Sequence, residues 1–455
     1  MSPRNQVRLH DFVFRGAPDG APLAISALPD FWESASPAQR AGLTGQFAAH
    51  WQRGTRHTLV RDPLGVHKLF FALDAEGQLV ASTYAHDLVT AGIPFSRVCS
   101  VPSGHSVVID TDTRAYALEQ YSVLPYGDPD APMCDLESHA ERVRQALDTV
   151  FARLARTLEG REVVVTLSGG LDSSTIAAMA RARFPKVRGI TFTTADATAC
   201  AQSDLFFARM VAERLDIPLE VVEVSRERIV SLVDEVLIGG QDFRDFNVHC
   251  GLVNAALAEA LAQHASGSAP PVILTGDAMN ELVSDYAPVE YAGERFYDLP
   301  RMSAGRLRRF LVLGLDSGDR EVGIFARRGI ECVQPYTLCA GAYTQLPGGF
   351  LTSSAAKREL VTRVMGDRIP SPIYDRPKVR AQVGSAQKVG GTLAAMIEAG
   401  LDATALVSRF AELFGIRAED ASKEARAFIR GGLYRFTHVF PGSSEEKSIH
   451  VSRDR

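Results

Sequence analysis

Hydrophobic and polar residues follow two different patterns along the chain. From about residue 11 to residue 123, short runs rich in Val, Leu, Phe and Thr are broken by Gly, Pro and Asp, with little helical periodicity. This texture is typical of antiparallel strands and hairpins. The clearest runs lie at 58–60, 68–73, 79–82 and 105–110. The first part of the chain is therefore predicted to be β-rich.

The second part begins after a loop at 124–133 that is dense in proline and acidic residues. Apolar strands then alternate with longer helical patterns, which predicts an α/β fold with a doubly wound parallel sheet and helices on both faces. Ligands of such sheets bind beyond the carboxyl ends of the strands. Strands are predicted at 163–167, 189–193, 219–224 and 272–275, and helices at 136–156, from 173 onward, at 205–215, at 229–238 and at 250–264.

The length of 455 residues favours two domains, because a single hydrophobic core seldom organises so long a chain. We predict a first domain at 1–125, a linker at 126–135 and a second domain at 136–440. Residues 287 to about 432 are expected to be mostly helical. The polar segment 441–455 is expected to be disordered.

Composition narrows the class of protein. The formal net charge of -5 gives no cationic field for nucleic acid or anionic lipid, so a small-molecule or peptide substrate is expected. Six cysteines without a CxxC pair predict reduced thiols, not a zinc site or a disulfide framework. No signal peptide or membrane-length apolar run is recognisable, which favours a cytoplasmic protein. The sequence leaves a homo-oligomer open.

The most informative stretch is the string Ser-Gly-Gly-Leu-Asp-Ser-Ser at 168–174, which leads from a buried strand into a helix. Glycines allow a ligand to approach the backbone closely, and hydroxyls and unpaired amides at a helix start present donors to an anion. The spacing differs from the P-loop and from the dinucleotide GxGxxG motif. The alternative is a turn in which Gly169 and Gly170 serve only the backbone and Ser173 only caps the helix. We interpret the string as a phosphate loop.

This string resembles the pyrophosphate loop of the N-type ATP pyrophosphatases, and specifically that of the asparagine synthetase and β-lactam synthetase family. The resemblance implies a HUP-like synthetase domain that cleaves ATP to AMP and pyrophosphate. It also implies that Asp172 helps to hold Mg²⁺. The residues expected to bind ATP or pyrophosphate are Leu167, Ser168, Gly169, Gly170, Asp172, Ser173 and Ser174.

Three further segments resemble the same family. The segment 273–282 resembles its second ATP loop, so Thr275 and Gly276 are expected to meet the nucleotide and Asp277 to orient or deprotonate an attacking amine. The alternative for Asp277 is a solvated loop acid. Segment 374–385 resembles the one that carries the family's essential lysine, which places Lys378 beside the leaving phosphates. Segment 328–336 makes Glu331 a catalytic candidate that either anchors the site or pairs with an arginine.

The chain departs from this family in two places. Asn280 stands where the second loop carries an aspartate ligand of Mg²⁺, so metal affinity should fall unless Asp277, Glu281 or waters compensate. The β-rich part resembles the Ntn glutaminase domain, notably in the run 61–71, yet the sequence begins Met1-Ser2-Pro3 and has no cysteine before Cys99. We therefore expect a degenerate Ntn-like domain without glutaminase activity.

Together these features predict an ATP- and Mg²⁺-dependent ligase that adenylates a carboxylate and couples it to ammonia or an amine, in specialised metabolism such as antibiotic biosynthesis. Asp172 and Asn280 are the metal candidates, and Lys378, Asp277 and Glu331 the catalytic ones. Alternatives are a β-lactam- or macrolactam-forming cyclase of the same family, a tRNA-thiolating pyrophosphatase, and an ATP-binding pseudoenzyme.

Overall fold

The computed structural model describes residues 12–14, 22–128, 131, 135–195, 203–264, 270–286, 288–299, 301–351, 354–384, 389–421 and 423–424. These residues form two compact units. The first holds the described residues up to 123, the short segment 316–318 and the described residues from 407 onward, and the second holds 124–315 and 319–406. From the sequence, residues 407–440 were expected to belong to the second domain. The predicted tail at 441–455 and part of the predicted linker lie outside the described residues.

The first unit is built from three small sheets, as the short apolar runs predict. Their strand orders are β2-β1-β3, β10-β9-β5-β4 and β7-β6-β8, and every pairing is antiparallel. The strands are β1 (Phe12–Phe14), β2 (Pro22–Leu23), β3 (Thr44–Gln46), β4 (Ala48–Arg53), β5 (Arg56–Arg61), β6 (Phe70–Leu73), β7 (Leu79–Ser82), β8 (Cys99–Ser100), β9 (His105–Asp110) and β10 (Ala115–Gln120).

Two of these sheets share one apolar core. Leu59 and Val107 come from the four-stranded sheet and meet Phe71 and Cys99 from the sheet β7-β6-β8. All four are fully buried, so the two sheets pack face to face. The unit also contains three short helices that the sequence analysis did not predict, namely α1 (Leu28–Ser34), α2 (Pro37–Ala41) and α3 (Ala85–Thr90).

The run 61–71 has a structural task in this unit. The Arg61 guanidinium is 1% exposed and donates to the backbone oxygens of His67, Val101 and Gly65, at 2.8, 2.7 and 2.8 Å. The buried carboxylate of Asp62 accepts hydrogen bonds from three amides of the following turn. These contacts satisfy buried polar groups, which accounts for the run without a ligand.

The second unit is organised around a five-stranded parallel sheet of order β13-β12-β11-β14-β17. Its central strand is buried on both faces, which explains the unbroken valines at 163–165. The chain first adds β12 and β13 on one side of β11 and then returns to add β14 and β17 on the other side, so the winding of the sheet reverses between β11 and β14. The strands are β11 (Val163–Thr166), β12 (Val187–Thr193), β13 (Leu219–Glu223), β14 (Val272–Leu274) and β17 (Glu331–Val333).

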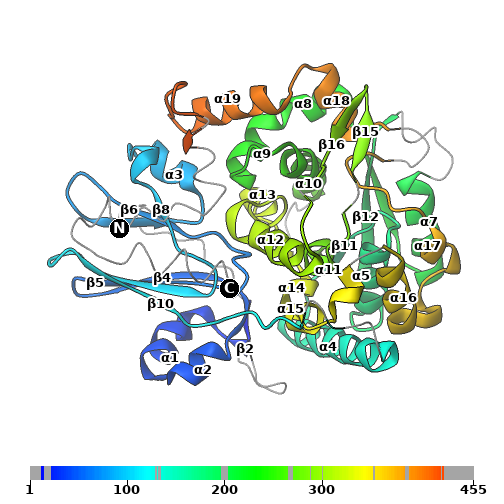
Figure 1. Cartoon of the computed structure of the whole chain (residues 1–455), viewed down its shortest axis with the longest axis horizontal. Helices are drawn as coiled ribbons and strands as arrows, with labels where there is room; N and C mark the ends of the chain where they lie inside the picture. Colours follow the sequence, from blue (N-terminus) through cyan, green and yellow to red (C-terminus); the bar gives the residue numbers. More distant parts are fainter. Residues whose placement is uncertain are drawn as a thin grey trace. The chain divides into compact units, whose positions relative to one another are not determined.

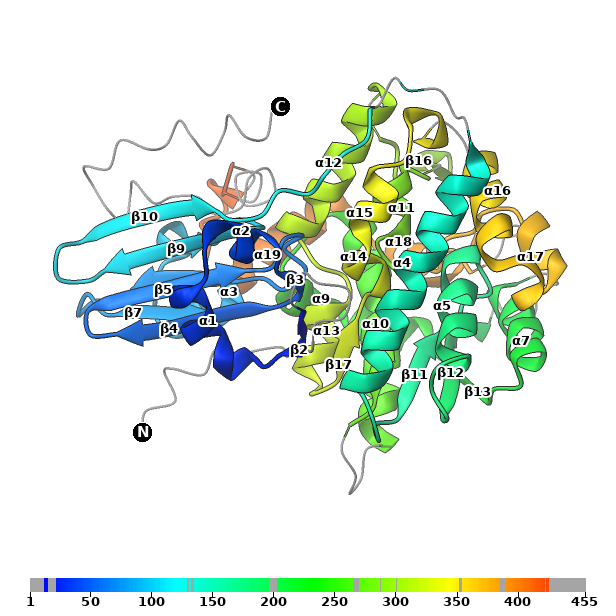
Figure 2. The same ribbon diagram turned by 90° about the horizontal axis from the view of Figure 1, so that it is seen from below.

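Helices cover both faces of this sheet, as the alternating pattern predicts. Figure 1 shows α9, α10 and α13 on one side of β11 and β12, and α5, α7 and α16 on the other. In Figure 2, α4 runs beside α5 on the latter side, and the two helices are in contact. The bounds are α4 (Leu136–Thr157), α5 (Leu171–Arg181), α7 (Asp204–Leu215), α8 (Arg226–Ser231), α9 (Val233–Gly240), α10 (Asp245–His264), α11 (Met279–Val283), α12 (Ala304–Ser317), α13 (Val322–Arg327), α14 (Pro335–Leu338), α15 (Ala340–Thr344), α16 (Ser354–Met365), α17 (Ser371–Asp375), α18 (Gly391–Glu398) and α19 (Ala403–Leu413).

Two elements of this unit interrupt the stretch that was expected to be mostly helical. Strand β17 completes the edge of the sheet, and β15 (Val289–Tyr291) pairs with β16 (Glu294–Phe296) as an antiparallel hairpin. All three strands are only three residues long, too short to show a clear alternation in sequence. Among the described helices, none is both long and apolar enough to cross a bilayer.

Candidate active site

Two loops meet at the carboxyl ends of the adjacent strands β11 and β14, where the winding of the sheet reverses. A Cβ atom on Gly276 would lie only 2.7 Å from the Ser173 backbone nitrogen, so the second loop touches the start of α5. Gly169 has φ 68°, and a Cβ there would lie 2.4 Å from the Phe207 Cβ. Both glycines are therefore required by close backbone approach, and they bring the loops to the switch point where ligands of open α/β sheets bind.

The first loop is held by its own serines. Ser173 Oγ accepts from the Ser168 amide at 3.2 Å and lies 3.1 Å from the Ser168 hydroxyl. Gly170 precedes the first turn of α5, an eleven-residue helix whose amide groups face this loop. The N-terminus of such a helix attracts anions. The loop is thus a preformed cradle whose hydroxyls fix its shape.

A further arginine ties this loop to its surroundings. Arg376 donates to the Ser168 carbonyl oxygen at 2.8 Å, stacks over Phe207 with its guanidinium carbon 4.4 Å from the ring centre, and pairs with Asp204. Burial raises the pKa of Asp204 to about 6, although Arg376 opposes that shift. Arg376 therefore helps to hold this loop in place.

Beside the loop lies a group that we call the phosphate-side cluster, in which two lysines meet three oxygen-bearing side chains. Lys357 Nζ lies 2.8 Å from Asp172 Oδ1, 2.8 Å from Asn280 Oδ1 and 3.2 Å from Asp285 Oδ2. Lys378 Nζ contacts Asn280 Oδ1 and lies 2.9 Å from Asp285 Oδ2. The cluster therefore consists of Asp172, Asn280, Asp285, Lys357 and Lys378.

The two lysines of this cluster are electrostatically different. Burial, together with the positive charge of Lys357, lowers the pKa of Lys378 to about 8. Burial also opposes the charge of Lys357, but Asp172 and Asp285 outweigh it and raise the pKa of Lys357. At neutral pH both side chains are cationic, and Lys378 is the one closer to losing its proton.

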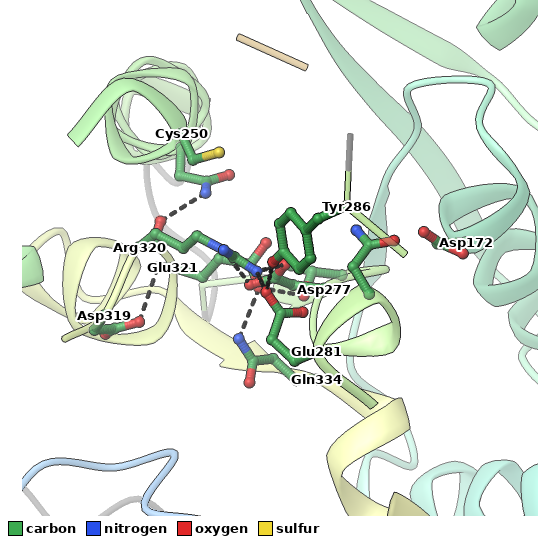
Figure 3. Close-up of polar contacts among 12 residues, drawn as sticks. Asp172, Cys250, Asp277, Glu281, Tyr286, Asp319, Arg320, Glu321 and Gln334 are labelled. Carbon is green, nitrogen blue, oxygen red and sulfur yellow. Dashed lines mark hydrogen bonds and ion pairs between the residues drawn. The ribbon is translucent and has the colours of Figure 1, made fainter. Parts of the chain in front are cut away.

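A second group, the Arg320 cluster, borders the same pocket. Arg320 pairs with Asp277 through two nitrogens, one of them 2.7 Å from Oδ2, and its Nη2 lies 2.5 Å from Glu281 Oε1. Figure 3 shows the guanidinium lying among Asp277, Glu281 and Tyr286, with Asp172 apart from it. Tyr286 donates its hydroxyl to Glu281. The cluster is completed by Glu321, which accepts from the Thr275 hydroxyl at 2.5 Å and from Gln334 at 2.9 Å.

The acids of the Arg320 cluster differ in their pKa values. Burial raises the pKa of Asp277, and Arg320 offsets the shift only in part. Burial opposes the charge of Glu281 as well, but there Arg320 and the Tyr286 hydroxyl outweigh it and lower the pKa. Burial and the charge of Asp277 raise the pKa of Glu321 well above its ordinary value. The positive charge of Arg320 is thus paired with the carboxylates of Glu281 and Asp277, while Glu321 favours its protonated form.

The predicted site residues do not all reach the pocket. The pocket is lined by Leu167, Ser168, Gly170, Asp172, Ser173, Gly276, Asp277, Asn280 and Lys378, all of which the sequence analysis named. Ser174 and Thr275 are fully buried and do not line it, and Gly169 supports the turn. Asp277 is not the solvated acid of the alternative interpretation, because its carboxylate is 14% exposed and ion-paired.

Glu331 is separated from the other candidates. It is the first residue of β17, so it lies at the amino end of a parallel strand, opposite the carboxyl ends that bear the pocket. Its carboxylate pairs with Arg161 at 2.5 Å. This geometry matches the alternative in which Glu331 simply pairs with an arginine, and we do not include it in the site.

Several pocket residues were not predicted from the sequence, namely Asp285, Tyr286, Arg320, Glu321, Lys357 and Arg376. Arg376 stood inside the quoted segment 374–385, next to Lys378, and could have been found there. Lys357 lies on α16 and Arg320 just before α13, without a local motif around either. Only the tertiary fold brings them to the loops.

Chemically, the pocket combines an anion cradle, two ammonium groups and oxygen donors. The cradle and the lysines suit phosphate groups that carry negative charge. Among the described residues, no group of three or more His, Cys, Asp or Glu side chains is arranged to hold a metal ion. Mg²⁺ that arrives with a nucleotide does not need such a cage, because phosphate oxygens and waters fill most of its positions.

Comparisons with known proteins show which proteins this chain is similar to. Residues 142–319 match the family model described as asparagine synthase. The human asparagine synthetase (glutamine-hydrolysing) is 26% identical over 345 residues, which cover 70% of this chain and 59% of the human protein. The orangutan enzyme, from Pongo abelii, gives the same identity and shares. The chain thus spans less than two thirds of the length of these relatives.

Shorter and weaker similarities exist as well. A tRNA-specific 2-thiouridylase from Rhodopseudomonas palustris is 40% identical over 89 residues, covering 17% of this chain and 22% of that protein. Among solved structures, the NMN synthetase from Francisella tularensis aligns with 67% of this chain and 94% of its own, at 14% identity and a TM-score of 0.31.

Proposed function

We propose that the chain is an ATP-dependent carbon–nitrogen ligase that forms an amide bond, because its residues 142–319 match the asparagine synthase family model. The observation that carries the proposal is the phosphate-side cluster, in which Lys357 and Lys378 stand beside the cradle at the switch point of the sheet. The relatives span more than this chain, so their activity supports the proposal by analogy.

The proposed reaction has two steps. A carboxylate oxygen of the acyl substrate attacks the α-phosphorus of ATP, the bond between the α- and β-phosphates breaks, and pyrophosphate leaves. The nitrogen of ammonia or an amine then attacks the acyl carbon, the bond to AMP breaks, and the nitrogen loses a proton. Lys378 and Lys357 stabilise negative charge that develops on the leaving phosphates in the first step.

Asp277 is the proposed group that orients the attacking amine or accepts its proton. Its carboxylate lines the pocket, and the rise of its pKa on burial makes it a better proton acceptor than an exposed carboxylate. Arg320 holds both oxygens in place, which fixes the direction of approach. This role suits an external amine or an amine of the same substrate equally well.

Mg²⁺ fits this site by the chemistry of its donors. The Asp172 carboxylate and the Asn280 amide oxygen point to one position beside the cradle, since both contact Lys357 Nζ. Oxygen ligands are those that Mg²⁺ prefers. When bound, the ion neutralises charge on the phosphates, and Asp172 with Asn280 would hold it.

We also propose that ammonia or an amine reaches the site directly, without glutamine hydrolysis. Cys99 is fully buried in the core between two sheets of the first unit, where it cannot meet a substrate. A place in specialised metabolism stays a prediction from the resemblance to β-lactam synthetases.

The test follows ATP in the presence of purified protein, Mg²⁺, ammonia and a panel of amino acids and small carboxylates, with AMP resolved from ADP by chromatography. Acid-dependent AMP and pyrophosphate are expected. ADP as the product would overturn the mechanism. ATP binding without turnover on any acid would favour the pseudoenzyme.

The variant Lys378→Ala ties the reaction to the site. Loss of one cationic donor to the leaving phosphates should lower turnover about 10²- to 10³-fold while ATP binding persists. Lys186→Ala is the matched control, because Lys186 is exposed and lies outside the pocket. Unchanged turnover in Lys378→Ala would remove the proposed role of this lysine.

A further inference from the structure

The second loop lacks a carboxylate at the position where the family resemblance implies a metal ligand, because residue 280 is asparagine. From the sequence, Asp277, Glu281 or waters were expected to compensate for the missing charge. Both of those acids are bound to Arg320, and Glu281 also accepts the Tyr286 hydroxyl. Neither Asp277 nor Glu281 contacts Lys357 or Lys378, so the charge missing at Asn280 has to come from elsewhere.

Asp285 is placed to supply that charge. Helix α11 ends at Val283, and the next residue, Ser284, has a φ of 56° that turns the chain back on itself. The Asp285 amide donates to the Asn280 carbonyl oxygen at 3.1 Å. The turn returns the Asp285 carboxylate to the side chain of Asn280, although five residues separate them. A serine with positive φ is uncommon, so this reversal costs backbone free energy that the local contacts must offset.

The contacts of both lysines show that the side chains of Asn280 and Asp285 lie at one location. Lys378 Nζ contacts Asn280 Oδ1 and, at 2.9 Å, Asp285 Oδ2. Lys357 Nζ lies 2.8 Å from Asn280 Oδ1 and 3.2 Å from Asp285 Oδ2, and the same nitrogen contacts Asp172. The Asp285 side chain is only 6% exposed. Three oxygen donors therefore converge on one cationic position next to the phosphate cradle.

The charges of this cluster also suit exchange with a nucleotide. Asp172 and Asp285 carry two negative charges, and Lys357 and Lys378 carry two positive charges, so the cluster is balanced. Phosphate oxygens are charged acceptors, as the carboxylate oxygens are, so the phosphates of a nucleotide can replace the carboxylates as partners of the two ammonium groups. Once the lysines turn to phosphates, two carboxylates and an amide oxygen remain for a divalent cation, which matches the one or two carboxylates that Mg²⁺ takes beside phosphates.

We propose that Asp285 is a carboxylate ligand of the Mg²⁺ that enters with ATP, acting with Asp172 in place of the charge absent at Asn280. This inference rests on the proposed function, because it assumes a nucleotide at the cradle. Asp285 is then a metal ligand five residues beyond the position where the resemblance implies one. Lys357 and Lys378 occupy the cation position until the metal–nucleotide complex arrives.

The experiment measures metal binding, not turnover. Electron paramagnetic resonance measures the concentration of free Mn²⁺ while the full chain is titrated in the presence of α,β-methylene-ATP. This analogue cannot be cleaved to pyrophosphate. Loss of a ligand in Asp285→Asn should weaken Mn²⁺ binding about tenfold or more. The double variant Asn280→Asp with Asp285→Asn should recover most of that loss, since the carboxylate returns to the same location.

Two controls keep the result interpretable. Binding of α,β-methylene-ATP in EDTA, followed by calorimetry, should persist in Asp285→Asn, which shows that the variant folds and keeps the cradle. Asp216→Asn is the matched carboxylate control, because its side chain is 98% exposed and outside the pocket. It should bind Mn²⁺ as wild type does.

The outcomes separate this inference from the proposed function. Nucleotide binding with a Mn²⁺ affinity that Asp285→Asn leaves unchanged would overturn only the role of Asp285. A loss of nucleotide affinity in EDTA that is as large as the loss of Mn²⁺ affinity would also overturn it, because the effect of the variant would then be structural. Failure of wild type to bind the nucleotide in either condition would overturn the proposed function, and this inference with it.

Discussion

The pocket is bordered by two charged clusters that share one loop and differ in design. The phosphate-side cluster places two lysines among two carboxylates and an amide, and Lys378 remains 24% exposed. The Arg320 cluster places one arginine among acids, and its guanidinium contacts Asp277 and Glu281 by at least two nitrogens. In the phosphate-side cluster each contact is made by the single nitrogen of an ammonium group. In the Arg320 cluster the contacts are made by several nitrogens of one planar guanidinium.

This difference has a physical consequence. A lysine ammonium is a point charge on a flexible stem and changes partners easily, whereas a bidentate arginine fixes its partners in direction. The phosphate-side cluster is therefore suited to release its carboxylates when phosphates arrive. The Arg320 cluster is suited to keep Asp277 in one orientation through the reaction. Breaking each cluster should consequently produce a different kind of loss.

The largest effect is expected from Arg320→Met, which leaves Asp277 and Glu281 buried without their partner. Removal of one member of a buried ion pair costs about 3–5 kcal/mol in the free energy of unfolding. Urea unfolding should be followed by far-ultraviolet circular dichroism, because both tryptophans, Trp32 and Trp51, belong to the first unit. The Arg320 cluster belongs to the second unit.

The control for this variant is Arg161→Met. Arg161 also pairs with a carboxylate, that of Glu331, but the two side chains are 32% and 20% exposed and lie at the other end of the sheet. A pair that is screened by solvent should cost at most about 1 kcal/mol. Equal losses in Arg320→Met and Arg161→Met would show that the Arg320 cluster is not the fixed scaffold that its burial indicates.

A smaller effect is expected from pH, and on turnover it should act through the phosphate-side cluster. With a pKa of about 8, Lys378 loses its proton as pH rises, so turnover should fall above pH 8 while Arg320 stays charged. Lys378→Arg keeps the positive charge to higher pH, so the fall in turnover should begin at a higher pH in this variant, even if its maximal rate is lower. We call this fall the alkaline limb of the profile. The measurement is AMP release against pH, and a limb that stays in place in Lys378→Arg would assign it to another group.

The sequence predicted the part of the site that is local. A strand followed by Ser-Gly-Gly and a helix carries its geometry within a few residues, so the cradle at 168–173 was found without the fold. The alternation of strands and helices predicted the parallel sheet for a similar reason. Lys357 could not be found in this way, because only the packing of α16 against α5 brings it to Asp172.

Glu331 shows what a local motif cannot determine. The stretch around it was expected to be helical, so the strand β17 and its direction were unknown. In a parallel sheet, the first and last residues of a three-residue strand lie at opposite ends. Glu331 is the first, and its side chain consequently meets Arg161 instead of the pocket. The position of a residue along its strand, which the sequence left open, decides whether it can take part in the reaction.

The smallest effect is expected from Glu321→Gln, which tests whether this acid is already neutral within the Arg320 cluster. The raised pKa of Glu321 means that the folded protein keeps a proton that the unfolded chain releases, so stability should fall as pH rises from the ordinary glutamate pKa toward the raised value. A glutamine offers the same acceptor oxygen to Thr275 and Gln334 without a titrating proton. The free energies of unfolding from urea titrations should therefore agree within about 1 kcal/mol near pH 5, and the value of the variant should decline less steeply with pH. The same decline in both proteins would mean that Glu321 is charged in the folded state, and that Arg320 neutralises three carboxylates instead of two.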